Sequence, residues 1–293
     1  MLDQHQKDDI DKISKEILKQ SKAYDTFPTP VDKIVNYAEL NVAENINLSK
    51  LEPDFFDKFS GAFKNTLDKI RGLLDREEKV IYLDLDQTTN RKNFVKLHEV
   101  GHDVLPWQKA TLKYLDNNST LDLNTSESFE AEANYFASAT LFQHDRFIRE
   151  LNKLPLGIES SLHLSKFFGA SIHATLRRYV EHTKKRCALI VLENLKKNGF
   201  SSSCEVRNYF QSTSFMDAFG KINWELVLNS EWAFVQDYTW GRRLKQDGNF
   251  QFFIDNEEIT FQYHFFNSSY NSFVLFFPKG EVKKSKVKII IKE

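Results

Sequence analysis

The sequence predicts an α+β protein built from three parts. Amphipathic helical patterns fill most of residues 1–150, with one short apolar run of strand type among them. Residues 151–186 continue as helices, whereas residues 187–293 consist of short alternating or apolar runs that are typical of strands. We therefore expect a mainly helical first unit with a small edge sheet, a helix-turn-helix-like helical segment, and a C-terminal, mostly antiparallel α/β domain.

The overall composition gives no sign of a membrane or nucleic-acid partner. The 293 residues carry a net charge of −1, so no global field favours anionic surfaces, and 41% hydrophobic residues can fill the cores of two domains. The N-terminus has no apolar signal segment, and no apolar run is long enough to span a membrane. Two cysteines, Cys187 and Cys204, do not make a disulfide framework. We expect a cytoplasmic protein.

The first part opens with helical patterns and one strand. An amphipathic helix is expected near residues 7–22, a second helix follows the turn signal FPTP at residues 31–37, and a longer helical pattern covers about residues 53–74. The run EKVIYLDL then predicts a strand near residues 80–85. Two more helices complete this part, and they carry the motifs that indicate a function.

The first of these helices contains the pentad HEVGH at residues 98–102. Thr89 or Asn90 can cap its start, the helical pattern runs over residues 91–105, and Pro106 stops it. The pentad therefore lies on a helix, where its spacing has a geometric meaning.

Residues four apart on a helix are about 40° apart around its axis and one turn along it, so His98 and His102 project from the same face. Two imidazoles placed in this way can share one metal ion. Glu99 lies roughly 100° round the helix, beside the metal, where its carboxylate can act as general base toward an activated water. The HExxH pattern thus predicts metal-assisted peptide hydrolysis.

A catalytic metal site of this kind needs a third protein ligand. The segment SESFEAEANYFASATLFQ supplies candidates on a second helix, which Thr125 or Ser126 can cap and which runs to about Gln143. Acidic residues are common near any helix start, because they favour the positive end of the helix dipole. Spacing alone does not choose among the three acids there, Glu127, Glu130 and Glu132.

These two motifs together resemble the ImmA/IrrE family of metallo-endopeptidases. That family has an HE(L/I)GH helix followed by a helix of the form ExEANxFA, and this chain has HEVGH and then EAEANYFA at residues 130–137. The resemblance implies a zincin-like catalytic unit whose third zinc ligand is the acid four residues before the Asn, which is Glu130. Glu132 is then an acid of the helix start or one that supports the ligands from outside.

The resemblance extends beyond the ligands, with departures. The run EKVIYLDL stands where the family has an edge strand, and Arg91 and Phe94 match residues that often precede the pentad. Phe142 and Gln143 replace the usual Met-Pro after the second helix. The presumed ligands and the base are all present, so the resemblance implies an active enzyme.

What the resemblance implies is a zinc-dependent endopeptidase, with Mn²⁺ as an alternative metal. Its ligands would be His98, His102 and Glu130, and Glu99 its general base. Peptidases of this family commonly cut a partner protein, a helix-turn-helix transcriptional repressor, so the protein would act in regulatory proteolysis.

The segment 151–186 supports a rival interpretation. It carries LSKFFGASIHATLRRYV, in which the apolar, small, turn, cap and recognition positions of a helix-turn-helix are filled by Leu164, Ser165, Gly169, Ser171 and Thr175. Basic residues outnumber acidic ones here, which suits phosphate contacts: Lys166, Arg177, Arg178, Lys184, Lys185 and Arg186. The alternative is therefore a DNA- or protein-binding regulator with a non-catalytic metal site. A structural zinc site normally has a fourth protein ligand, often a cysteine, and neither cysteine lies near the motifs in sequence. This observation favours the enzyme.

The third part holds more than half of the 26 phenylalanines. Its apolar runs read as strands joined by polar turns such as NSSYN, and no motif in it identifies a ligand. The runs are CALIVLE, EVRNYF, FQFFI, ITFQYHFF, SFVLFFP and VKIII.

Overall fold

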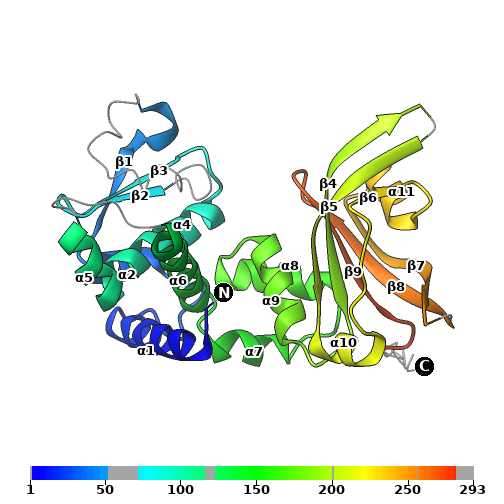
Figure 1. The fold of residues 1–293 in the computed structure, drawn as a ribbon, viewed down its shortest axis with the longest axis horizontal. Helices are drawn as coiled ribbons and strands as arrows, with labels where there is room; N and C mark the ends of the chain where they lie inside the picture. Colours follow the sequence, from blue (N-terminus) through cyan, green and yellow to red (C-terminus); the bar gives the residue numbers. More distant parts are fainter. Residues whose placement is uncertain (1, 52–71, 116–122, 200, 256, 282–293) are drawn as a thin grey trace, which may run out of the picture. The chain divides into compact units, whose positions relative to one another are not determined.

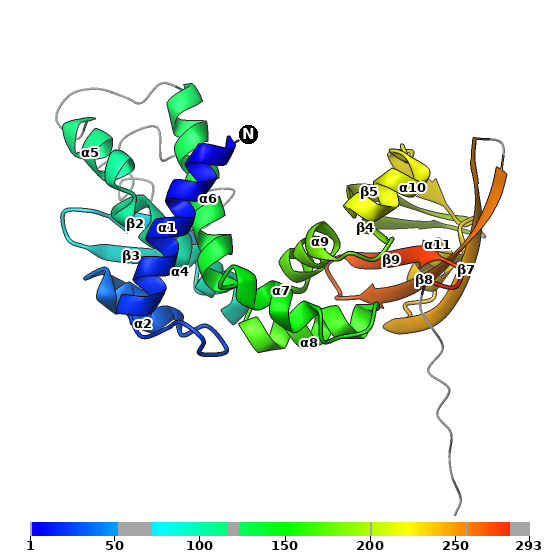
Figure 2. The same ribbon diagram turned by 90° about the horizontal axis from the view of Figure 1, so that it is seen from below.

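A computed structural model of the chain describes residues 2–51, 72–115, 123–199, 201–255 and 257–281. The chain forms two compact units, which are described separately. The first consists of Met1–Phe147 and Leu164–Ser171, and the second of Ile148–His163 and Ile172–Glu293. Figure 1 and Figure 2 show both units. The expected α+β class is confirmed.

The first unit is mainly helical, with α4 and α6 at its centre. Helix α1 packs along α6, and α2 packs on α4 (Figure 2). The buried face of α1 is apolar, as the amphipathic pattern predicted, and includes Ile10, Ile17 and Leu18. The helices are α1 (Gln4–Gln20), α2 (Val31–Tyr37), α4 (Thr89–Val104), α5 (Pro106–Leu115), α6 (Leu123–Leu141) and the start of α7 (Asp145–Leu151).

Both predicted caps of the two motif helices are wrong by one to a few residues. Thr88 caps α4, because its hydroxyl oxygen accepts a hydrogen bond from the backbone N–H of Arg91. Helix α6 begins at Leu123, so Thr125 and Ser126 lie inside its first turn. Pro106 does stop α4, and it opens α5 directly afterwards.

A three-stranded sheet completes the first unit, in the order β1-β3-β2. Strand β1 (Asn41–Asn47) is parallel to β3 (Val80–Leu83), and β2 (Gly72–Asp75) is antiparallel to it. The predicted strand near residues 80–85 is confirmed, but it is the central strand of the small sheet and not an edge strand. Residues 72–74, expected at the end of a helix, are a strand; the rest of that expected helix lies outside the described residues.

Two helices with a tight turn occupy the middle of the chain, as predicted. Helix α8 (Ile158–Phe168) begins in the second unit and ends in the first, and α9 (Ile172–His182) belongs to the second. Gly169 between them has φ of +70°, a left-handed conformation that glycine adopts without a steric penalty. Two helices joined by a tight turn are therefore present at the predicted place.

The second unit is built on a six-stranded sheet in which every pair of neighbours is antiparallel, in the order β6-β5-β4-β9-β8-β7. The sheet curves into a half-barrel (Figure 1). Its elements are β4 (Ala188–Asn198), β5 (Ser201–Gln211), α10 (Thr213–Phe219), β6 (Val227–Asn229), α11 (Ala233–Thr239), β7 (Leu244–Ile254), β8 (Glu257–Asn267) and β9 (Ser272–Pro278).

The phenylalanines of this part form its core, as the composition suggested. Phe215 of α10 and Phe234 of α11 pack with sheet residues such as Phe250, Phe261 and Phe276. Five of the expected strands are confirmed, and the run VKIII lies outside the described residues.

Cys187 and Cys204 are buried and unpaired. Within the described parts of the chain, every helix is too short or too polar to cross a membrane.

Candidate metal centre

Helices α4 and α6 approach each other closely at the HExxH pentad. A β-carbon on Gly101 would lie 3.1 Å from Cδ1 of Phe136 and 3.3 Å from the Cα of Ala133. The second variable position of the pentad is therefore filled by glycine, the one residue that lets the two backbones come this near. This contact brings the first turns of α6 over the histidines of α4.

Three side chains converge where the helices meet. The Nε2 atoms of His98 and His102 are 3.0 Å apart, and they lie 3.3 Å and 3.4 Å from the two carboxylate oxygens of Glu130. Both histidines are buried, and Glu130 is 19% exposed. Among the described residues, these three are the ones grouped closely enough to hold a metal ion together.

The spacing of these three atoms fits a zinc ion. Ligand atoms at about 2.0–2.1 Å from a tetrahedral zinc are about 3.3 Å from one another. The observed separations of 3.0, 3.3 and 3.4 Å lie around that value. Two imidazoles and one carboxylate are also a donor set that catalytic zinc sites use. The residues present therefore fit the metal that the motif implies.

The electrostatics of the cluster also favour a cation. Burial favours the neutral form of Glu130, but the hydrogen bonds and charges of His102 and His98 outweigh it and hold its pKa at about 2. Burial likewise opposes protonation of His102, yet Glu130 raises the pKa of this ring above its usual range. The cluster thus favours the charged form of the carboxylate, which suits a bound divalent cation.

Glu99 lies beside these three side chains and does not belong to their cluster. Its side chain is buried, and Gly72 of β2 leaves room for its carboxyl group: a β-carbon there would be 3.1 Å from Oε1. Burial raises the pKa of Glu99 against the charges of His98 and His102, so its carboxylate is a stronger base than an exposed one. This position is the one that the helix geometry predicted for a general base.

Glu132 lies next to the site without entering the cluster. Its Oε2 accepts hydrogen bonds from Trp107 Nε1 and Gln108 Nε2, each at 2.7 Å. Gln108 Oε1 in turn lies 2.7 Å from Nδ1 of His102. Sequence reasoning missed Gln108, because no motif marks it and its contact with α6 arises only in the folded chain. Glu127 and Asn134 are exposed.

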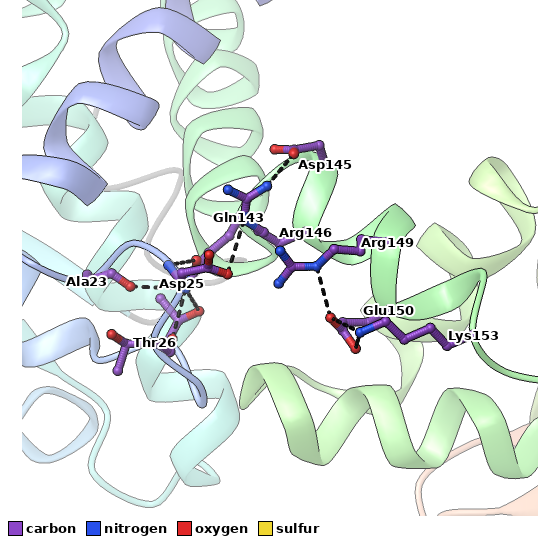
Figure 3. A network of polar contacts seen from close by, with 10 residues as sticks. Ala23, Asp25, Thr26, Gln143, Asp145, Arg146, Arg149, Glu150 and Lys153 are labelled. Atoms are coloured by element: carbon purple, nitrogen blue, oxygen red, sulfur yellow. Dashed lines mark hydrogen bonds and ion pairs between the residues drawn. The ribbon is translucent and has the colours of Figure 1, made fainter.

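Gln143, which stands in place of the family's usual Pro, has a structural role. Its buried amide nitrogen donates to the carbonyls of Ala23 and Thr26 and to Thr29 Oγ1, and its oxygen accepts from the backbone N–H of Asp25. Figure 3 shows this network, including the ion pairs of Arg146 with Asp25 and Asp145. The same view shows the ion pairs of Glu150 with Arg149 and Lys153.

The helix-turn-helix-like positions are mostly inside the protein. Leu164, Ser165 and Thr175 are buried, so Thr175 is not presented as a recognition residue would be. Arg177 pairs with Glu181 at 2.7 Å, and Arg186 pairs with Glu281 at 2.8 Å. The local structure therefore gives little support to sequence-specific DNA recognition by α9.

An α+β unit in which an HExxH helix and a later helix, here α4 and α6, bring two histidines and a glutamate together has the architecture of a metallopeptidase. Residues 61–179 match the family model of the IrrE N-terminal-like domain, peptidase family M78. This match confirms the resemblance to that family for residues 61–179. Among curated proteins, no significant sequence match was found.

Solved structures with a similar fold include one that matches most of the chain. It is a Mycobacterium tuberculosis transcriptional regulator, with a TM-score of 0.50 and 11% sequence identity, and the likeness covers 92% of this chain and 76% of that one. At this identity the similarity concerns the fold.

Proposed function

We propose that the protein is a zinc-dependent endopeptidase that acts in regulatory proteolysis. The observation that carries the proposal is the convergence of His98, His102 and Glu130 at tetrahedral spacing with Glu99 beside them. The peptidase family of residues 61–179 supports it. In this proposal residues 1–150 are the peptidase domain, 151–186 a helix-turn-helix-like segment and 187–293 a separate C-terminal domain.

The roles of the side chains follow from their positions. His98, His102 and Glu130 hold a divalent cation, Zn²⁺ or alternatively Mn²⁺, which supplies a Lewis acid for attack of water on a peptide carbonyl. Glu99 takes the proton of the attacking water and delivers it to the amine nitrogen as the peptide bond breaks. Burial raises the pKa of Glu99 and so strengthens it as a base.

We further propose a protein substrate, namely a helix-turn-helix transcriptional repressor. The support is the family of the catalytic segment and the resemblance of the two motif helices, since peptidases of this kind commonly cut such partners. No side chain of the site specifies that class by itself.

The test separates peptidase activity from substrate choice. The purified chain with Zn²⁺ or Mn²⁺ is incubated with a proteome-derived peptide library and, separately, with the repressor encoded beside its gene; cleavage is read by mass spectrometry. We expect internal cuts that Glu99→Gln abolishes while one metal stays bound per chain. Equal cutting by Glu99→Gln would contradict the mechanism. Cuts in peptides but not in the repressor would contradict only the substrate class.

The alternative function is a DNA- or protein-binding regulator with a metal site that does no chemistry. The basic residues of the α8–α9 segment and the transcriptional regulator of similar fold favour it. It predicts metal binding without any cleavage, together with retarded migration of duplex DNA that disappears when Arg177 and Arg178 are replaced. The same preparations therefore decide between the two functions.

A further inference from the structure

We propose that Gln108, held by Glu132, is a positioning residue that fixes the ring tautomer of His102 so that its Nε2 faces the metal. The proposal rests on the metal site proposed above. It assigns a role to two residues that are neither ligands nor the general base.

The orientation of the Gln108 amide follows from its acceptor-only neighbours. One end of the amide lies 2.7 Å from Glu132 Oε2 and 3.1 Å from the carbonyl oxygen of Phe129. A carboxylate and a carbonyl only accept hydrogen bonds, so this end must be the NH2 group. The oxygen of the amide therefore faces His102.

That orientation determines which nitrogen of His102 carries hydrogen. Gln108 Oε1 lies 2.7 Å from Nδ1 of His102, and an amide oxygen can only accept, so Nδ1 must donate. In a neutral imidazole with hydrogen on Nδ1, the lone pair is on Nε2. Nε2 is the atom that meets His98 and Glu130 in the cluster. Gln108 thus preselects the tautomer that a metal requires.

The two histidines differ in this respect. Nδ1 of His98 is buried and has no hydrogen-bond partner among the described residues. The ring of His98 therefore has no such polar contact at Nδ1, whereas the ring of His102 is held there by Gln108. We infer that loss of the Glu132–Gln108–His102 hydrogen bonds loosens His102 and not His98.

Glu132 is itself held from three sides, which makes it a firm anchor. Trp107 Nε1 donates to the same oxygen as Gln108, at 2.7 Å, and Gln6 of α1 donates to Oε1 at 3.3 Å. Glu132 and Gln108 are both buried. Gln108 belongs to α5 and Glu132 to α6. The hydrogen bonds from Glu132 through Gln108 to His102 therefore connect both helices to this proposed ligand on α4.

Two substitutions test these hydrogen bonds, one at Gln108 and one at Glu132. Gln108→Met keeps the length of the side chain and removes the acceptor for His102. Glu132→Gln keeps the shape but introduces a donor, so the Gln108 amide can turn and present its NH2 group to His102. Trp107→Phe is the matched control, because it removes a donor to Glu132 and leaves the amide of Gln108 oriented.

The primary measurement is the dissociation constant for Zn²⁺ by competition with a chromophoric chelator. Loss of a partner that orients a ligand weakens metal binding by about 10–100-fold. We expect that range for Gln108→Met and Glu132→Gln, and a much smaller change for Trp107→Phe. Thermal unfolding of the metal-free variants shows whether each still folds. Affinities of both test variants equal to wild type would overturn the proposal.

A spectroscopic readout examines the tautomer directly. In the zinc-loaded full chain labelled with ¹⁵N, the Nδ1 of His102 is expected to carry hydrogen and Nε2 to show the shift of a metal-bound nitrogen. Coordination through Nδ1 would overturn the proposal. Both readouts are independent of cleavage, so the positioning role and the peptidase function can fail separately.

Discussion

Gly72 of β2 lies directly beside the carboxyl group of Glu99 on α4. A β-carbon on Gly72 would be 3.1 Å from Glu99 Oε1 and would overlap Cγ1 of Val95 one helical turn earlier. The absence of a side chain at this position lets the buried strand β2 approach α4 this closely. The glycine therefore sets the position of the proposed base.

Gly72→Ala should lower cleavage without loss of the metal. The new methyl group would displace Val95 and Glu99, neither of which is a proposed ligand, and a misplacement of about 1 Å can cost on the order of 100-fold in rate. We expect a loss of roughly 10–100-fold in kcat. Cleavage of peptides identified in the proposed library assay, and zinc content by atomic absorption, check this.

The control for Gly72→Ala is the double variant with Val95→Ala, which removes the carbon that the new methyl group overlaps. It should recover part of the lost activity. Full activity in Gly72→Ala alone would show that the strand does not position Glu99.

Gly101→Ala is predicted to weaken metal binding instead. Its methyl group would press on Phe136 and on the backbone of Ala133, so α6 must move away from α4 and carry Glu130 with it. Overpacking of this kind costs about 1–3 kcal/mol of stability. A raised dissociation constant for zinc, together with a lower midpoint of urea unfolding, is the expected result. Gly101→Val should have the larger effect, and an unchanged metal affinity in both variants would contradict this account.

Only part of the proposed site can be predicted from the sequence. His98, Glu99 and His102 share one helix, so their arrangement follows from residue spacing along that helix. Glu130 was chosen by the family resemblance, since spacing left three acids open. Gln108 and Gly72 act across elements distant in sequence, and no periodicity marks such contacts.

The fold shows the same division between local and long-range information. The Phe-rich and β-branched runs of the second unit predicted its strands, because such residues suit a half-buried sheet. Strand β1 was missed because NVAENIN is polar and mostly exposed on both faces. The cap of α4 was misplaced by one residue because Thr88, Thr89 and Asn90 are all favourable caps.

Gln143→Leu should destabilise the first unit. Leucine has a similar volume but leaves the carbonyls of Ala23 and Thr26 and the N–H of Asp25 without their amide partner. Each buried polar group that loses its partner costs about 1–3 kcal/mol, so for these three groups we expect a total loss of roughly 3 kcal/mol or more. Urea unfolding of the metal-free chain measures it.

The control for Gln143→Leu is Asp145→Ala, which removes an exposed partner of Arg146. Exposed ion pairs contribute about 0–1 kcal/mol, so this change should be small. Equal effects of the two substitutions would mean that the amide of Gln143 does not hold residues 23–29 in place.

His173 should make the second unit sensitive to acid. Its ring lies near Phe210 and Phe273, and burial, with the positive charges of Arg207 and Arg177, lowers its pKa to about 4. The unfolded chain takes up the proton near its ordinary pKa of about 6.5, whereas the folded chain does so only near 4. Stability is therefore full above pH 6.5 and falls as the pH decreases from 6.5 to 4.

The variant His173→Phe removes this titration and keeps an aromatic ring among aromatic neighbours. A shift of one pKa unit corresponds to about 1.4 kcal/mol, so the variant should lose about 1–3 kcal/mol less stability than wild type over that pH range. His182 and His264, whose pKa values burial also lowers, keep part of the slope. Thermal unfolding at several pH values measures it, with His5→Gln on the exposed face of α1 as control. Identical slopes for wild type and His173→Phe would show that the ring of His173 takes up its proton equally well in the folded chain.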